Sequence, residues 1–560
     1  MIPRTFELGT KIPYSPQLFA KDVFAGVIVG VVALPLAMAF SISAGGSPAQ
    51  GLYTAIIAGF FISFLGGSRY QIGGPTGAFV VIIYGVIARH GMSGLIVATI
   101  LAGVMLVAMG LSKLGKLIKY IPYPVTTGFT TGIGILIFSQ QLKDFFGLTI
   151  ERSSPEFFEQ WAGYISNAHT ANPEALGIAL LTAAIILVMR RFVKRIPGAI
   201  VGVVAATVLT HFAALPIETI GSKFGGIPST LPLPVVPQLS WAMVRDVFPD
   251  AFTIAMLAAI ESLLSAVVAD GMTGDKHDSN MELTAQGIGN IMSGIFGGIP
   301  ATGAIARTAA NIKNGSVSPI SGIIHTVTLT LFILFLSPLA SSIPLASLAA
   351  VLIVVSWDMS NIPKFIDIAH YSPKSDTLVL VVTFLLTIVV DLTFAVQAGM
   401  VIALILFMRR VISVTEIKAQ NYDLLTELVY SDTMERKTVA GIKALSKRDI
   451  EVFEITGPFF FGVADMLQTT LLRLEQKPHT VVLRMRNMTS IDSTGITALD
   501  SFYTACKKQN IRMVLYEICT QPKKALEHSR LIKKIGTENV FEDIPIQELF
   551  TALGSENSLE

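Results

Sequence analysis

The sequence predicts a polytopic α-helical membrane domain followed by a small α/β domain. The 560-residue chain is 52% hydrophobic and 14% charged, whereas soluble domains are usually about 25% charged. Residues 1–412 carry about one charge in ten residues, and residues 413–560 carry about one in four. The formal net charge of +2 gives no basis for nucleic-acid binding, and two cysteines cannot form a disulfide framework.

Fourteen apolar segments with few charges predict the membrane spans, although a full helical span needs about 20 residues and some are shorter. They are 22–44, 50–67, 75–88, 93–111, 122–142, 174–189, 199–215, 248–269, 282–299, 303–312, 318–336, 343–357, 376–390 and 392–408. With the N-terminus inside, the cytoplasmic segments hold 17 Lys and Arg residues against 5 outside. This bias predicts that both termini are cytoplasmic.

The charged C-terminal region predicts a linker and then a soluble domain. Strands are expected at 452–455, 481–485 and 511–516, with helical segments between them, which is typical of a small α/β sheet. The predicted organisation is a cytoplasmic N-terminus at 1–21, a transmembrane domain at 22–412, a linker at 413–449, an α/β domain at 450–553 and a tail at 554–560.

A motif recurs in the third and tenth predicted spans. Gly73–Ala78 and Gly297–Ala304 each contain Gly-Gly, then Pro, then Thr-Gly-Ala. The copies are seven spans apart, so they have opposite topology. Paired spans interrupted by Gly and Pro in two inverted halves indicate the midplane site of a transporter. Small residues can also serve close helix packing alone, but the duplication favours a binding site.

Each motif copy predicts a short helix that starts inside the membrane. Such a start exposes free N–H groups and the positive end of the helix dipole. Two of these ends facing each other would form an anion site. Pro75 and Pro300 suit helix starts, and the glycines would let a ligand approach the backbone.

Two ionisable residues stand out inside predicted spans, where charges are costly and usually functional. Arg307, one turn into the tenth span, could complete an anion site. Glu261, at the centre of the eighth span, could accept a proton and couple anion entry to the proton gradient, and Ser265 one turn later could donate to a ligand. A structural Glu261–Arg307 ion pair is the alternative interpretation.

The α/β domain holds one candidate regulatory position. Asp492-Ser493-Thr494-Gly495 follows a predicted strand and opens a helix. N-capping is the favoured interpretation. Ser493 could also be phosphorylated, because a phosphate is stabilised at a helix N-terminus.

These motifs together resemble the SulP family of anion transporters, also called the sulfate permease or solute carrier 26 family, over about residues 15–553. The matching stretches are LPLAMAF at Leu34–Phe40, GLYTA at Gly51–Ala55, GGSR at Gly66–Arg69, GGPTGAF at Gly73–Phe79, TGFTTGIG at Thr127–Gly134, IESLLSAVVADGMTG at Ile260–Gly274, GNI at Gly289–Ile291, ARTAAN at Ala306–Asn311 and, in a region similar to a STAS domain, DSTG at Asp492–Gly495. Within the family the chain looks closest to the C4-dicarboxylate/proton symporter branch, most clearly across Asp270–Asn290.

The resemblance implies 14 spans in a seven-plus-seven inverted repeat with a core and a gate domain. It also implies half-helices at spans 3 and 10, elevator-like movement, a homodimer, and a cytoplasmic, regulatory STAS domain with protein partners. The substrate-binding residues that it implies are Leu36, Phe40, Thr76, Gly77, Ala78, Phe79, Ser265, Gly303, Ala304, Ile305, Ala306 and Arg307, with Glu261 beside them.

The leading functional hypothesis is a proton-coupled secondary transporter of the plasma (inner) membrane for sulfate, bicarbonate or a C4-dicarboxylate. Arg307 is present here, whereas sodium-coupled bicarbonate members of the family lack it, which favours protons. Sodium-coupled bicarbonate uptake and anion exchange are alternatives, and a membrane-anchored STAS signalling scaffold is the alternative of another class. The sequence shows no nucleophile–base pair, metal cluster or phosphate loop, so no enzyme activity, cofactor or metal is expected.

Overall fold

The chain folds into two compact units, which are residues 1–403 and 404–560. The computed structural model describes residues 2–8, 14–116, 122–150, 156–192, 197–234, 240–390, 392–419, 450–460, 467, 478–542, 544, 548–549 and 553. The two units are described separately below.

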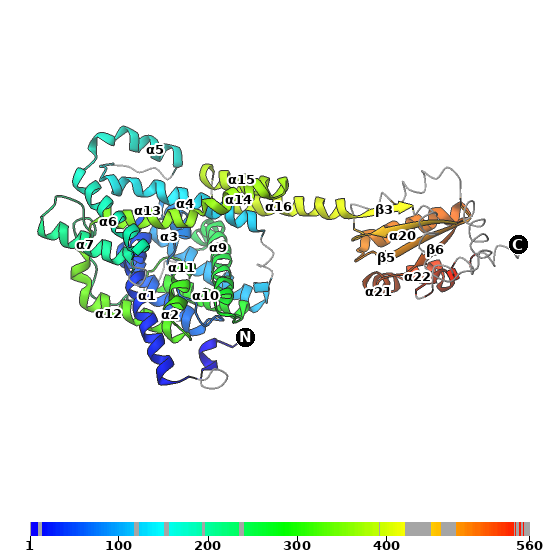
Figure 1. Cartoon of the computed structure of the whole chain (residues 1–560), viewed down its shortest axis with the longest axis horizontal. Coiled ribbons are helices and arrows are strands. Elements are labelled where there is room, and N and C mark those ends of the chain that lie inside the picture. The colour runs from blue at the N-terminus through cyan, green and yellow to red at the C-terminus, as the bar shows by residue number, and fades with distance from the viewer. Residues whose placement is uncertain are drawn as a thin grey trace. The chain divides into compact units, whose positions relative to one another are not determined.

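The first unit is almost entirely helical, and a helix lies at each of the fourteen predicted spans (Figure 1). Its elements are η1 (Arg4–Glu7), α1 (Pro16–Ser43), α2 (Pro48–Leu65), β1 (Gly73–Gly74), α3 (Gly77–Leu111), α4 (Tyr123–Phe146), α5 (Phe157–Ser166), η3 (Ala168–Thr170), α6 (Pro173–Phe192), α7 (Gly198–Phe212), α8 (Ile220–Phe224), α9 (Trp241–Thr273), α10 (Ser279–Ile295), β2 (Thr302–Gly303), α11 (Ile305–Lys313), α12 (Ile320–Ala340), α13 (Leu345–Ser360), α14 (Ile362–Tyr371), α15 (Lys374–Val389) and α16 (Leu392–Val414), the last continuing into the second unit.

Eight helical stretches of the described residues are long and apolar enough to cross a membrane. The others are shorter or less apolar. For example, α7 has 15 residues and α11 has 9. The third and fourth predicted spans together form α3, which is interrupted at Gly91, where φ is 67°. Only glycine adopts this left-handed conformation without a steric penalty, so the glycine separates the short first part of α3 from its second part.

Glycines bring the helices around the motifs into close contact. A Cβ atom on Gly103 of α3 would lie 2.6 Å from the Gly287 carbonyl oxygen of α10, and a Cβ on Gly287 would lie equally close to the Gly103 oxygen. Between α1 and α2, a Cβ on Gly51 would lie 2.0 Å from the Ala37 oxygen. Backbone contacts of this kind are typical of membrane helices. They join α1, α2, α3 and α10 into one tightly packed body.

The second unit contains a five-stranded sheet in the order β3-β4-β5-β6-β7, in which β3 is antiparallel to β4 and the other pairs are parallel. Its elements are β3 (Glu416–Ala419), β4 (Ile450–Thr456), β5 (Thr480–Asn487), α20 (Ser493–Lys508), β6 (Arg512–Tyr516), α21 (Thr520–His528), α22 (Leu531–Ile535), η4 (Thr537–Asn539) and β7 (Val540–Phe541).

The three strands predicted from the sequence correspond to β4, β5 and β6. The helices α20, α21 and α22 cover one face of the sheet, with Phe453, Leu499 and Leu526 in the shared core. Leu549 and Leu553 pack against Val482 on the other face. The predicted linker at 413–449 includes β3, because Glu416–Ala419 pairs with β4, and its residues 420–449 lie outside the described residues.

Candidate functional site

The two motif copies meet as a short antiparallel pair of strands. In this pair Gly73 lies opposite Gly303, and Gly74 lies opposite Thr302. Helix α3 starts shortly after β1, and α11 starts shortly after β2. The fold therefore brings together two segments that are more than 220 residues apart in the sequence.

The two Thr-Gly-Ala sequences do not occupy equivalent positions. In the first copy Thr76 is the N-cap of α3 and Gly77 begins the helix. In the second copy Thr302 and Gly303 form the strand, and Ala304 is the N-cap of α11. Ile299 and Ala301 interrupt the second copy, so its motif is displaced toward the strand. The two motif copies therefore correspond as segments that each precede a helix, but their Thr, Gly and Ala residues do not correspond one to one.

Polar side chains from the surrounding helices hold the segment before α11. Asn290 of α10 bonds both the amide (2.9 Å) and the carbonyl (2.8 Å) of Ala301. Thr54 of α2 accepts the Ile299 amide at 2.7 Å, and Thr302 donates to the Ala258 carbonyl of α9 at 3.0 Å. Extended backbone at membrane depth needs such partners.

The sequence interpretation gave these supporting residues no role. Both Asn290 and Thr54 lie in stretches that carried the family resemblance, GNI at Gly289–Ile291 and GLYTA at Gly51–Ala55. Their role becomes visible only when α2, α9 and α10 are placed around β2.

Arg307 links the two copies. Its side chain is 3% exposed, and Nη2 donates to the Pro75 carbonyl at 2.6 Å. Nη1 has no hydrogen-bond partner among the described residues, and it lies 2.5 Å from the position that a Cβ on Gly74 would take. A buried guanidinium with an unused donor is costly, so an anionic acceptor here would be stabilised.

Glu261 and Ser265 lie on either side of this arrangement. Thr76 donates to Glu261 Oε2 at 3.3 Å, so the carboxylate lies beside the start of α3. Ser265 is fully buried and donates to Thr308 of α11 at 3.2 Å. Among the described ion pairs none joins Glu261 to Arg307 within 4.0 Å. The alternative interpretation of a structural Glu261–Arg307 pair is therefore wrong, because Arg307 turns to Pro75 instead.

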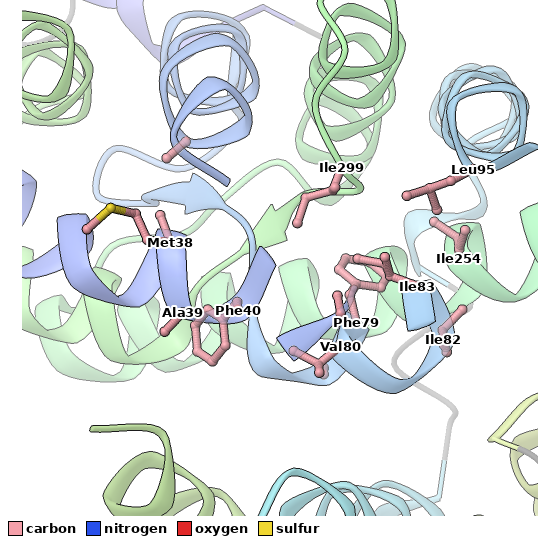
Figure 2. Close-up of a cluster of buried hydrophobic side chains, with 14 of the residues drawn as sticks. Met38, Ala39, Phe40, Phe79, Val80, Ile82, Ile83, Leu95, Ile254 and Ile299 are labelled. Carbon is pink, nitrogen blue, oxygen red and sulfur yellow. The ribbon is translucent and has the colours of Figure 1, made fainter. Parts of the chain in front are cut away.

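The other predicted contact residues differ in how accessible they are. Thr76 and Ile305 are half-buried, and Ala306 is exposed. Ala78 and Phe79 are fully buried, with Phe79 packed among Val80, Ile83 and Ile299 of the apolar core (Figure 2). The side chains of Ala78 and Phe79 are therefore not accessible to a ligand from solvent. Only the backbone at these two positions could contact one.

Close approaches also occur at Gly77 and Gly303. The Phe40 ring lies 3.2 Å from the position of a Cβ on Gly77. A Cβ on Gly303 would lie 1.9 Å from Gln71 Nε2, which donates to the Ser262 carbonyl at 3.0 Å. Leu36, one helical turn before Phe40, faces a separate cavity. Phe40 and Gly77 thus lie together at the start of α3, whereas Leu36 does not join them.

The groups at the two helix starts are of a kind that can bind an anion. Neither Thr76 nor Ala304 caps its helix through its side chain. The first N–H groups of both helices are therefore free of side-chain caps. The Arg307 guanidinium and the Glu261 carboxyl group lie near these helix starts. No group of three or more His, Cys, Asp or Glu able to hold a metal ion occurs in the part of the chain that the structure describes.

In the second unit, Asp492 caps α20. Its Oδ1 accepts the Gly495 amide at 2.8 Å, as the capping interpretation predicted. Ser493 is the first helical residue and is exposed. Its hydroxyl is therefore accessible without unfolding.

A membrane unit with two motif-started helices, followed by an α/β sheet unit, defines a membrane transporter with a soluble appendage. The model of the sulfate permease family matches residues 19–383, and the model of the STAS domain matches residues 442–545. The chain belongs to the sulfate permease family.

Relatives and a solved structure agree with this membership. The chain is 41% identical over 534 residues to the putative sulfate transporter YvdB of Bacillus subtilis (94% of this chain and 97% of the relative). It is 34% identical over 457 residues to the bicarbonate transporter BicA of a Picosynechococcus species (79% of each). Its fold matches the murine solute carrier 26 member A9 anion transporter, with a TM-score of 0.84 at 20% identity (99% of this chain and 94% of that chain).

Proposed function

We propose that the chain is a proton-coupled secondary transporter of a small anion, which binds between the starts of α3 and α11. The observation that carries this proposal is Arg307, a buried cation with a free donor at the junction of the two motif copies. The bound anion would accept from Arg307 and from the first N–H groups of the two helices, and Thr76, Ile305 and Ala306 would surround it.

Glu261 is the proposed coupling residue. It lies beside Thr76 at the start of α3, so its charge acts directly on an anion bound there. A deprotonated Glu261 repels the anion, and protonation removes this repulsion. The anion and the proton would therefore be bound together, which is the requirement for symport.

An elevator-like movement is consistent with the packing. The segments that carry the site belong to the glycine-packed body of α1, α2, α3 and α10, to which α9 and α12 also pack. The helices α6, α7 and α13 pack with one another in a second group. We propose that the first group is the core and the second belongs to the gate of a seven-plus-seven repeat, with half-helices at spans 3 and 10. On the family resemblance we also propose a homodimer with both termini and a regulatory STAS domain in the cytoplasm.

The names of the relatives direct the choice of substrates. YvdB is named a putative sulfate transporter and BicA a bicarbonate transporter. We propose an oxyanion of this size as the substrate, and we keep C4-dicarboxylates as the third class to test. The apolar Phe40 beside Gly77 gives no polar group that would select among them.

The test is uptake by the purified full-length chain in liposomes. Labelled sulfate, bicarbonate and succinate are each offered with an inward proton gradient, an inward sodium gradient or neither. We expect one oxyanion to accumulate in response to protons. Accumulation driven by sodium would contradict the coupling proposal and leave the anion site intact.

Sodium-coupled bicarbonate uptake is the second candidate, and its bicarbonate part is supported by the bicarbonate transporter BicA, a relative at 34% identity. The buried positive charge of Arg307 argues against it, since a second cation nearby would be repelled. If folded protein transported none of the three anions under any gradient, the transporter proposal would fail for these classes and the signalling-scaffold alternative would gain.

A further inference from the structure

A cavity of about 630 Å³ lies between α1 and α11 on one side and α6, α7 and α13 on the other. Leu36, Ala199 and Val355 contribute to its apolar walls. Its charged lining residues are Arg190 at the end of α6, Lys313 at the end of α11 and Asp358 near the end of α13. The positive-inside bias assigns all three helix ends to the cytoplasmic face.

Arg190 and Lys313, the two cations of the cavity, differ in whether a carboxylate pairs with them. Arg190 Nη1 bonds both carboxylate oxygens of Asp358, at 2.8 and 3.0 Å, so its charge is largely balanced. Lys313 is exposed, and among the described residues no carboxylate lies within 4.0 Å of its ammonium group. Among the described residues, those that line the cavity therefore leave an excess of one positive charge, which is located on Lys313.

Two of the helices that line the cavity also carry residues of the site. Leu36 is one turn before Phe40, and Phe40 borders the start of α3. Lys313 ends the same helix that Ile305 begins, so the two lie about 12 Å apart at 1.5 Å per residue. Lys313 is thus too far away to touch an anion at the start of α11, and it lines the cavity together with Leu36.

We propose that this cavity is a second anion-binding site, which captures the substrate on the cytoplasmic side before it reaches the site between α3 and α11. Lys313 binds the anion, and Asp358 limits its dwell time both by holding Arg190 and by its own negative charge. The inference rests on the proposed anion transport and assigns it a site that faces the cytoplasm. A net positive charge in a cleft with low-dielectric walls raises the local concentration of anions.

The first experiment measures uptake of labelled sulfate, or of bicarbonate if the liposome panel selects it, by everted membrane vesicles that present this face. We expect Lys313→Gln to raise the half-saturating concentration about threefold to tenfold at low salt, and the difference to shrink at high ionic strength. Asp358→Asn should lower the half-saturating concentration. Opposite signs from two cavity variants would not arise from general structural damage.

The matched control is Lys364→Gln, which removes an exposed lysine from α14 that does not line the cavity. Uptake by right-side-out vesicles gives a second control, because the opposite face should show no effect of Lys313→Gln at saturating driving force. Equal changes in Lys313→Gln and Lys364→Gln would overturn the inference.

A second measurement does not depend on transport. Ala199→Cys, in a Cys519→Ser background, places a thiol in the cavity wall. Burial raises the pKa of the remaining Cys506 thiol to about 12, so it stays protonated and unreactive. We expect a negatively charged methanethiosulfonate reagent to modify Cys at position 199 faster than a positively charged one, and Lys313→Gln to reduce this ratio severalfold.

The outcomes separate the two proposals. If the modification ratio is insensitive to Lys313→Gln, the cavity does not concentrate anions and the inference is wrong even if transport is confirmed. If the ratio responds but Arg307 substitutions leave anion binding unchanged, the cavity site stands and the central site proposed above is wrong.

Discussion

The first backbone N–H groups of a helix lack partners within the helix, and the starts of α11 and α20 differ in how they satisfy them. In the second unit, the Asp492 carboxylate accepts the Gly495 amide, which satisfies one free N–H group of α20. In the first unit, Ala304 has no side chain able to cap α11, and the nearby Arg307 keeps a buried donor without a partner. The contrast indicates that the start of α20 has a hydrogen-bond acceptor within the chain, whereas the start of α11 can take an acceptor from a bound ligand.

The contrast also extends to the environment of each helix start. Ser493 at the start of α20 is exposed, so water can replace any missing partner there. Arg307 is buried, so a missing partner costs free energy until a ligand supplies it. Substitutions that change the buried start should therefore have large effects, and those at the capped start small ones.

The largest effect is expected from Gly303→Ala. The added methyl group would lie 1.9 Å from Gln71 Nε2 and 3.2 Å from Ser262 Cα, so Gln71 must leave its hydrogen bond to Ser262. Overpacking of this kind costs about 1–3 kcal/mol. We expect thermal stability and uptake both to fall, with uptake reduced more than tenfold. Gly177→Ala on α6, where nothing lies within 4 Å, is the control, and equal behaviour of the two variants would contradict the close approach at β2.

Glu261→Gln should have the next largest effect. The amide keeps the shape and the Thr76 contact but cannot exchange a proton, so anion binding should persist while the proton gradient no longer drives accumulation. Wild-type uptake should rise as the outside is acidified, and the variant should be flat. Asp246→Asn, an exposed acid on the same helix, should keep the wild-type profile. Full pH dependence in Glu261→Gln would exclude Glu261 as the coupling residue.

Asp492→Ala should have a smaller, local effect. Loss of an N-cap costs about 1 kcal/mol. Hydrogen exchange at the first turn of α20 in the full-length chain should become about fivefold faster, with anion affinity unchanged. An altered affinity would indicate that the cap of α20 acts on the membrane unit.

Ser493→Ala should have the smallest effect, because the exposed hydroxyl is not the cap. We expect a stability change within about 0.5 kcal/mol. Ser493→Asp, which mimics a phosphate, should alter uptake rate without altering anion affinity if this position is regulatory. A normal rate in Ser493→Asp would remove the support for regulation at Ser493.

Helix positions and strands could be predicted because each depends on a local pattern. Apolar runs located the helices of the first unit, and the succession of strand-like and helical segments located β4, β5 and β6. The interruption at Gly91 lies in the gap between the predicted spans 75–88 and 93–111. The strand at Glu416–Ala419 was not predicted, since it depends on pairing with a strand more than 30 residues later.

The candidate site was partly predictable for the same reason. The duplicated motif identified both segments. The two extra residues of the second copy, Ile299 and Ala301, are visible in the sequence, but the pairing of Gly73 with Gly303 is a long-range contact that no local pattern marks. Charge inside a span singled out Arg307 and Glu261, while the partner of Arg307, the Pro75 carbonyl, is a backbone group that no side-chain pattern marks. The role of Asn290 likewise needs the three-dimensional arrangement.

The most direct test of the central claim is equilibrium binding of the transported anion to purified full-length chain, starting with labelled sulfate, in wild type, Arg307→Lys and Arg307→Gln. A hydrogen bond to a charged group contributes about 1.5–3 kcal/mol, so Arg307→Gln should weaken binding at least tenfold. Arg307→Lys should bind with intermediate affinity, because it keeps the charge but not the fork of donors. An Arg307→Gln variant that is folded and binds the anion as tightly as wild type would contradict the proposal that the open helix starts and Arg307 form the anion site.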